Sequence, residues 1–218
     1  MEYKFFDLGL VDYKFAWDFQ KEIHSRVKNN EFYAAVIFCQ HYPVITATRN
    51  TDRNHILANQ EELRKRKINI YEVERGGDVT YHGPGQLIIY PIVNLNYFKK
   101  DLYLFLRNLE KITIDILTEF GILGERLAGL TGVWVGGGKI ASIGIAVKNW
   151  ITFHGLAINI KQNDLENFSL IRPCGMDIMM TSMESVLSKE ISIEDVKETL
   201  TRGWQYDESS LTGVGSRD

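Results

Sequence analysis

Apolar residues along this chain recur with two different periods, which separate predicted strands from predicted helices. Runs that alternate, or that are continuously apolar and bounded by turn residues, predict strands. These runs cover Met1 to Gly9, Phe32 to Gln40, Val44 to Thr48, Ile68 to Glu74, Gln86 to Asn94, Thr131 to Val135, Lys139 to Val147 and Ile151 to Ile160. A polar turn around Lys148 and Asn149 joins the last two strands.

Helical spacing is clearest between Asp101 and Phe120, where one stripe carries Leu102, Phe105, Leu106, Leu109, Ile112, Ile116 and Phe120. Gly121 is placed to end this helix, because glycine adopts the left-handed conformation of a helix C-cap. A second helix is predicted from Asp12 to about Asn29, with one face formed by Tyr13, Ala16, Trp17, Ile23 and Val27.

Three further helices are predicted from charge and capping patterns. The charged segment from Asn59 to Lys67 predicts a short helix. Thr181 precedes Glu184 by three residues, and Ser192 precedes Asp195 in the same way. A hydroxyl residue three positions before an acid is typical of a helix start, so two helices are expected to begin there.

Strands and helices are mixed without strict alternation, which predicts an α/β (α+β) domain with a mixed, largely antiparallel sheet flanked by helices. The chain has 218 residues, which fits one domain. We found no repeat or linker that divides it, so we expect a single domain over residues 1–206. The small, polar stretch at residues 207–218 is expected to be a flexible tail.

Charge and composition exclude several classes of partner. The net charge is −3, so nothing global suggests binding to nucleic acid or to an anionic membrane. The longest apolar runs are shorter than the ~18 residues of a membrane helix. The N-terminus has an early acid and neither a basic region nor a cleavage site, so we expect a cytoplasmic location.

Two cysteines in a chain of this size do not make a disulfide framework. Cys39 lies in a strand-like run and is expected to be a core thiol. Cys174 follows Arg172-Pro173 and precedes Gly175, a turn context that favours an exposed nucleophile. Lys139 opens a strand after a glycine run, and an ammonium close to a thiol lowers the thiol pKa. A core cysteine and a solvated surface lysine remain the alternative interpretations.

Four glycines and a proline lie between Arg75 and Gln86, in the segment Arg75-Gly76-Gly77-Asp78-Val79-Thr80-Tyr81-His82-Gly83-Pro84-Gly85-Gln86. Glycine lets the backbone approach a ligand closely, so we expect this segment to form a loop that joins two strands. The segment is not a dinucleotide fingerprint, because Ile88 stands where its third glycine should be. The glycines before Lys139 do not form a phosphate loop either, since Val133 and Ile140 replace its first glycine and its hydroxyl residue.

The predicted strands after Lys139 carry small residues on one face. These are Ser142, Gly144 and Ala146 in the first strand and Phe153, Gly155, Ala157 and Asn159 in the second. Two such faces side by side would leave a narrow slot for an alkyl chain or a pantetheine arm. Close packing of a helix over the glycines is an equally good interpretation.

The five histidines, at positions 24, 41, 55, 82 and 154, show no helical ligand spacing to another histidine, cysteine or carboxylate. A zinc site made by His82, His154 and Cys174 in space stays open as an alternative.

A set of motifs in this order resembles the octanoyltransferases of lipoate synthesis, in the biotin and lipoate protein ligase superfamily. The matching motifs are His41-Tyr42-Pro43-Val44, Arg75 to Gln86, Tyr90-Pro91-Ile92, Gly132-Val133-Trp134-Val135, Lys139-Ile140-Ala141-Ser142-Ile143-Gly144, His154-Gly155-Leu156-Ala157-Ile158-Asn159 and Pro173-Cys174-Gly175-Met176. They span most of the chain.

The resemblance implies an enzyme that moves an octanoyl group from the phosphopantetheine thioester of acyl carrier protein to a lysine of a lipoyl domain. Acceptors would be the acyltransferase subunits of 2-oxoacid dehydrogenases and the glycine cleavage H protein. It implies that Cys174 is the nucleophile and Lys139 its activating partner, with no ATP or metal cofactor. Acyl and pantetheine contacts would come from Arg75, Gly76, Gly77, Asp78, Val79, Thr80, Tyr81, His82, Ser142, Ile143, Gly144, Gly155, Leu156 and Ala157. The family more often has polar residues where this chain has Gly136, Gly137 and Gly138. This difference bears on how rigidly Lys139 is held, and not on its identity.

Three rival functions remain: an ATP-dependent lipoate or biotin ligase of the same fold, an amidotransferase that takes the acyl group from another carrier protein, and a noncatalytic module that holds lipoyl domains. The basic run Arg64-Lys65-Arg66-Lys67 is either a solvated helix face or a docking site for an acidic donor.

Overall fold

The computed structural model describes residues 3–204, with only the backbone at position 174, and is built around a six-stranded sheet. Only the first two of its strands are parallel to each other; the other neighbours are antiparallel. In spatial order the strands are β1 (Tyr3–Val11), β2 (Ala34–His41), β6 (Gln86–Val93), β9 (Ile151–Asn159), β8 (Gly138–Lys148) and β7 (Val133–Val135). The mixed, largely antiparallel sheet predicted from the sequence is confirmed.

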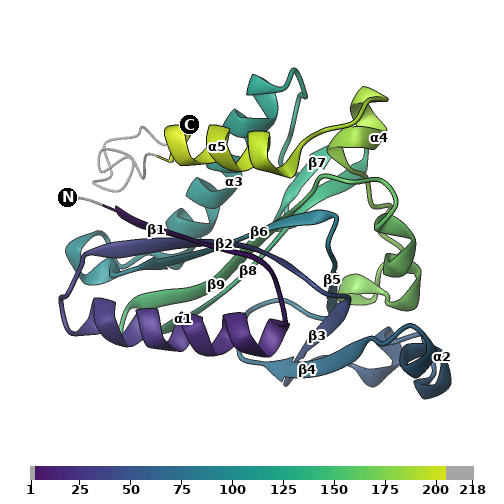
Figure 1. Cartoon of the computed structure of the whole chain (residues 1–218), viewed down its shortest axis with the longest axis horizontal. Coiled ribbons are helices and arrows are strands. Elements are labelled where there is room, and N and C mark those ends of the chain that lie inside the picture. Colours follow the sequence, from purple (N-terminus) through teal and green to yellow (C-terminus); the bar gives the residue numbers. More distant parts are fainter. Residues whose placement is uncertain (1–2, 205–218) are drawn as a thin grey trace.

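A second, three-stranded sheet lies beside one end of the large sheet (Figure 1). Its central strand β3 (Val44–Thr48) pairs in parallel with β4 (Asn69–Val73) and antiparallel with β5 (Thr80–His82). The sequence predicted a loop across residues 75–86, but part of this segment forms β5. A strand of three residues is too short to produce a periodic pattern, and only pairing with β3 defines it.

Helices cover both faces of the large sheet (Figure 1). Helix α1 (Tyr13–Lys28) lies on one face, and α3 (Leu102–Glu119) and α5 (Ile193–Gly203) lie on the other. Two shorter helices are α2 (Gln60–Lys65) and α4 (Met183–Leu187), and 3-10 turns span Arg53–His55, Leu95–Tyr97, Leu165–Leu170 and Pro173–Gly175. No helix among the described residues is both long enough and apolar enough to cross a membrane.

The predicted helices are confirmed, with two local differences. Leu102 was predicted in the apolar stripe of α3 but is exposed, and it is the first residue of the helix. The residue that caps α4 is Ser182 and not Thr181: its hydroxyl accepts a hydrogen bond from the Ser185 N–H. Gly121 adopts a φ of +77°, as expected for the residue that ends α3.

The chain has a hydrophobic core on each side of the large sheet. One lies under α3 and α5, and the other lies under α1. Every residue of the central strands β6 and β9 is buried. Cys39 is in the core under α1, as predicted, and burial raises the pKa of its thiol. The predicted tail from Asp207 onward lies outside the described residues.

Candidate active site

The glycine-rich segment after β4 lies directly on strand β8. The Gly76 N–H donates a hydrogen bond of 2.8 Å to the carbonyl oxygen of Ile145. A Cβ atom at Gly144 would come within 2.9 Å of the Gly76 carbonyl oxygen, so only glycine lets the loop backbone lie this close. The Arg75 guanidinium anchors the segment to β3 through hydrogen bonds of 2.9 Å to both the carbonyl and hydroxyl oxygens of Thr46.

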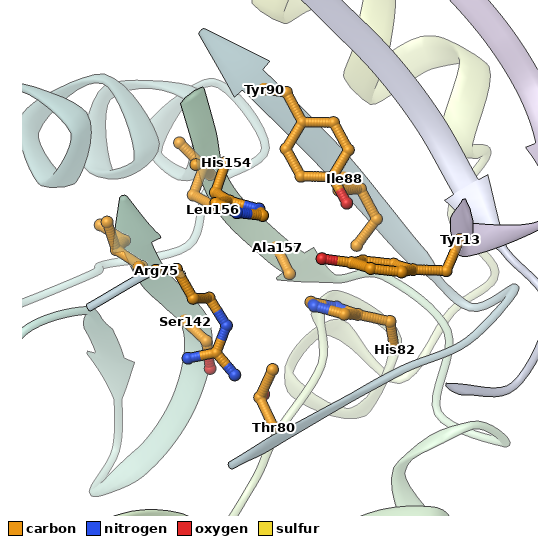
Figure 2. Close-up of a pocket in the computed structure, with 13 residues that line it drawn as sticks. Tyr13, Arg75, Thr80, His82, Ile88, Tyr90, Ser142, His154, Leu156 and Ala157 are labelled. Carbon is orange, nitrogen blue, oxygen red and sulfur yellow. The ribbon is translucent and has the colours of Figure 1, made fainter. Parts of the chain in front are cut away.

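A narrow cavity of about 50 Å³ lies beside this segment, on the face of the large sheet that α1 covers. Ser142 pairs with Ala157 and Gly144 with Gly155 across β8 and β9, so small side chains form its floor. Figure 2 shows Tyr13, Tyr90, His82 and His154 around the cavity, with Arg75, Thr80 and Ser142 along its other side. We call this cavity the slot; Ile88, Ile143 and Leu156 also line it.

The two glycines of the slot have different neighbours. A Cβ at Gly155 would come within 2.1 Å of the Ile89 carbonyl oxygen, so this glycine allows β6 to pack against β9. Gly144 is covered by the loop and not by a helix. The small residues leave a slot, as one interpretation predicted. The other interpretation, close packing of a helix over the glycines, is wrong, because a loop and strand β6 fill the space beside them.

Two buried histidines border the slot. His82 donates from Nδ1 to Oε1 of Gln86 at 3.0 Å, and burial lowers its pKa to about 3. His154 has a φ of +56° within β9, and its Nε2 lies 3.8 Å from Oε2 of Glu74. The interaction with His154 lowers the pKa of Glu74 to about 2. The wall of the slot thus carries a neutral imidazole of His82 at neutral pH.

Lys139 is held in place by the hairpin between β7 and β8. Gly136 and Gly137 form its two-residue turn, with φ values of +55° and +81°. The Lys139 Nζ atom lies 4.9 Å from the centre of the Trp134 ring. A Cβ at Gly132 would come within 2.7 Å of the Lys139 Cε atom, so the lysine chain runs along this glycine. The glycine run therefore makes a tight turn, and Lys139 packs between defined neighbours.

The backbone that follows Cys174 is tied to Lys139. Cys174 lies in the 3-10 turn Pro173–Gly175. Further along, the Met179 carbonyl accepts a hydrogen bond of 2.8 Å from the Lys139 N–H, and the Lys139 carbonyl accepts one of 3.0 Å from the Thr181 N–H. The Asn159 side chain donates to the Thr181 carbonyl oxygen at 2.9 Å. This register brings the cysteine turn to the edge of β8.

Lys139 and the cysteine turn line a common pocket of about 260 Å³ next to the slot. Pro173 contributes from the turn and Met176 from the position directly after it. The other lining residues are Gly77, Asp78 and Val79 of the glycine segment, with Gly129, Leu130, Thr131, Trp134 and Ile178. The pocket and the slot share Arg75, Thr80, Ser142 and Ile143. A thioester could therefore lie in the pocket while its acyl chain enters the slot.

Of the binding residues predicted from the sequence, two do not face either cavity. Tyr81 alternates with Thr80 and His82 in β5, so its side chain points the other way and its hydroxyl donates to Asp164 at 2.9 Å. Gly76 lies on β8 and borders an outer hollow. Among the described residues, no group of three or more histidines, cysteines, aspartates and glutamates is arranged to hold a metal ion.

The sequence interpretation missed several residues of the site. Tyr13 and Ile88 line the slot, and Trp134 lies under Lys139. The sequence pattern showed Tyr13 only as part of the buried face of a helix. Its position beside His82 of β5 is a tertiary contact, which a local pattern does not predict. Tyr90, Trp134 and His154 stood inside the resembling motifs, so those motifs were a signal that could have found them.

Comparisons with known proteins identify the family of the chain. Residues 12–205 match the family model of the lipoyl protein ligase A/B catalytic domain. An octanoyltransferase of Gloeobacter violaceus is 42% identical over 190 residues, which cover 87% of this chain and 82% of that relative. An octanoyltransferase of Caldicellulosiruptor saccharolyticus is 45% identical, over 87% of this chain and 81% of the relative.

Solved structures share the fold at low sequence identity. A crystal structure of lipoate-protein ligase A bound with ATP has a TM-score of 0.76 at 16% identity, covering 94% of this chain and 84% of that one. A biotin protein ligase of Aquifex aeolicus has a TM-score of 0.52 at 13% identity, covering 93% and 67%. Family model, octanoyltransferase relatives and shared fold show that the chain belongs to the lipoyl protein ligase A/B catalytic-domain family and, within it, is an acyltransferase of the octanoyltransferase group.

Proposed function

We propose that this enzyme takes octanoyl from octanoyl-acyl carrier protein and transfers it to a lysine of a lipoyl domain, through a thioester on Cys174. Acceptors are the acyltransferase subunits of 2-oxoacid dehydrogenases and the glycine cleavage H protein, and the setting is the cytoplasm, where thiols stay reduced. The observation that carries the proposal is the pocket shared by Lys139 and the cysteine turn, next to a narrow slot.

In the first half-reaction the octanoyl chain occupies the slot and its thioester carbonyl lies in the pocket. The Cys174 thiolate attacks the carbonyl carbon, the bond to the pantetheine sulfur breaks, and that sulfur leaves with the proton of the Lys139 ammonium, so that Lys139 becomes a neutral amine. The Lys139 ammonium stabilises the thiolate. Backbone N–H groups of residues 76–82 and of the Cys174-Gly175 turn are the donors we assign to the developing oxyanion.

In the second half-reaction the acceptor lysine attacks the octanoyl-Cys174 thioester. Neutral Lys139 takes the proton of the attacking amine, and the Cys174 sulfur leaves as a thiolate. Exchange between two thioesters is close to neutral in energy, and the final step from thioester to amide is downhill. The reaction therefore needs neither ATP nor a metal ion.

The direct test is intact mass measurement after mixing the enzyme with octanoyl-acyl carrier protein. We expect one octanoyl adduct, removed by hydroxylamine and located on Cys174 by peptide mapping. Cys174→Ser should lose the adduct and the transfer. Cys39→Ser is the matched control, because Cys39 is buried in the core and should not react. An adduct on Cys39, or full transfer by Cys174→Ser, contradicts the proposal.

The same assay separates the rival functions. Transfer from free octanoate that requires ATP indicates a ligase, which is relevant because a solved ligase of this fold contains ATP. Faster transfer from octanoylated H protein than from acyl carrier protein indicates an amidotransferase. Binding of a lipoyl domain without any adduct indicates a noncatalytic module.

A further inference from the structure

His55 joins the cysteine turn to the glycine-rich segment, although neither the sequence interpretation nor the proposed function assigns it a role. It ends the 3-10 turn Arg53–His55. Its carbonyl oxygen accepts a hydrogen bond of 2.7 Å from the Arg172 N–H, two residues before Cys174. Its Nδ1 lies 2.5 Å from Oδ2 of Asp78, which lines the pocket. His55 is therefore fixed from its backbone and from its ring.

The ring of His55 lies against the residue that follows Cys174. A Cβ atom at Gly175 would come within 2.8 Å of His55 Nε2 and 3.1 Å of Cε1. Gly175 also has a φ of +65°, so the turn needs glycine here both for its conformation and for the space that the imidazole takes. The imidazole thus lies directly beside the backbone of the cysteine turn.

The contact with Asp78 decides which nitrogen of His55 is available. Burial alone would raise the pKa of Asp78. Hydrogen bonds from the Thr51 side chain, the Val79 N–H and His55 outweigh this effect, so the pKa is lower than usual and Asp78 is a carboxylate at neutral pH. A carboxylate only accepts hydrogen bonds, so Nδ1 of His55 carries the proton that Asp78 accepts. In the neutral ring Nε2 then has a free lone pair, and this nitrogen faces the turn.

We infer that His55, oriented by Asp78, is a second acid–base group of the enzyme and serves the half-reaction of the Cys174 thiol. This inference rests on the proposed function. The thiol proton passes to Nε2 of His55, and the thiolate attacks the donor thioester beside the Lys139 ammonium, whose proton leaves with the pantetheine sulfur. Nε2 returns its proton to the Cys174 thiolate after the second half-reaction. Lys139 then serves the second half-reaction, in which it removes the proton of the acceptor amine.

The test compares the two half-reactions in one variant. Asparagine at position 55 keeps an N–H near the place of Nδ1, and so keeps the contact with Asp78, but it has no titratable Nε2. We expect His55→Asn to form the octanoyl adduct at least ~100-fold more slowly, the usual range for removal of an acid–base group. Once the adduct has formed, its transfer to the acceptor lipoyl domain should stay within about threefold of wild type, because Cys174 leaves as a thiolate.

A chemical rescue separates proton transfer from packing. Added imidazole should restore adduct formation in His55→Gly, since the missing ring leaves a space beside Gly175. His24→Asn is the matched control: this histidine is on α1, where its ring contacts Lys148 and Phe153, and its loss should not change either half-reaction. Melting temperatures show whether each variant is folded.

The outcomes distinguish this inference from the proposed function. If wild type forms no adduct on Cys174, the proposed function fails. If wild type forms it and His55→Asn forms it equally fast, or slows both half-reactions equally without imidazole rescue of His55→Gly, the acid–base inference is wrong. Should His55→Asn not fold, Asp78→Asn decides: a normal rate of adduct formation overturns the inference, and a loss of at least ~10-fold confined to that step supports it.

Discussion

Gly144 and Gly155 face each other across β8 and β9, but their substitution should have different effects. The space at Gly144 is taken by the carbonyl of Gly76, in a loop that also borders the slot. The space at Gly155 is taken by the backbone of β6 in the centre of the sheet. A loop can shift more easily than a central strand, so a side chain added at Gly155 should destabilise the fold more than one added at Gly144.

We expect Gly155→Ala to lower the free energy of unfolding by about 1–3 kcal/mol or more, because its Cβ would come within 2.1 Å of a backbone oxygen of β6. Chemical denaturation measures this loss. Gly203→Ala is the control, since a Cβ there meets nothing within 4 Å; it should leave stability unchanged or slightly increased. Equal stability of the two variants would show that β6 and β9 are not packed as described.

At the scale of elements, β8 and β9 determine the size of the slot, and the segment from Arg75 to Gly77 closes one side of it. Ser142 of β8 pairs with Ala157 of β9, and the alternation of side chains along each strand places both on the side of the sheet that α1 covers. Helix α2 contributes no residue to the slot or to the pocket. Its basic run is partly paired, because Arg66 contacts Glu62 and Asn167, which favours the interpretation as a solvated face.

Ala157→Val should narrow the slot without adding a polar group. With the octanoyl donor we expect adduct formation to fall by about 5- to 150-fold, which corresponds to the 1–3 kcal/mol typical of overpacking. A butanoyl donor needs less of the slot, so its rate should fall much less. The ratio of the two rates, measured by intact mass, is the readout. An equal loss for both donors would mean that the acyl chain does not lie over Ala157.

Across the whole molecule, the histidines link stability to pH. Burial lowers the pKa of His41 to about 4 and that of His82 to about 3, whereas an unfolded histidine has a pKa near 6.5. Between these values the unfolded state binds protons that the folded state does not, so stability rises with pH. Their contribution is complete above about pH 6.5 and is lost as the pH falls through 4 towards 3.

We expect the free energy of unfolding to decrease by about 1.4 kcal/mol per pH unit for each of these two histidines between pH 6 and pH 4.5. Urea unfolding at a series of pH values measures the slope. His41→Gln should reduce the slope by the share of one histidine, whatever its effect on absolute stability. A wild-type stability that stays constant over this range would show that these rings are accessible to protons in the folded state.

Most of the fold could be predicted because long elements carry strong periodic patterns. Helix α3 was identified from its stripe and from Gly121, and β3 from its apolar run. The short β5 was missed because three residues carry no period. For the site, the motifs identified most of the segments that line the slot and the pocket. The motifs did not show that the Tyr81 side chain points away from the slot while those of Thr80 and His82 point towards it. The direction of each side chain depends on how β5 pairs with β3.

The sequence by itself determined which of the longer segments become strands and helices, that Cys39 is a core residue, and which family the motifs resemble. These properties follow from local patterns of side chains, which do not require knowledge of the partners in space. Only the tertiary structure decided that Lys139, the cysteine turn and the glycine-rich segment border one pocket, and that His55 lies between two of them. Such contacts join residues far apart in the chain, and they are set by strand register and by the backbone approaches that individual glycines allow.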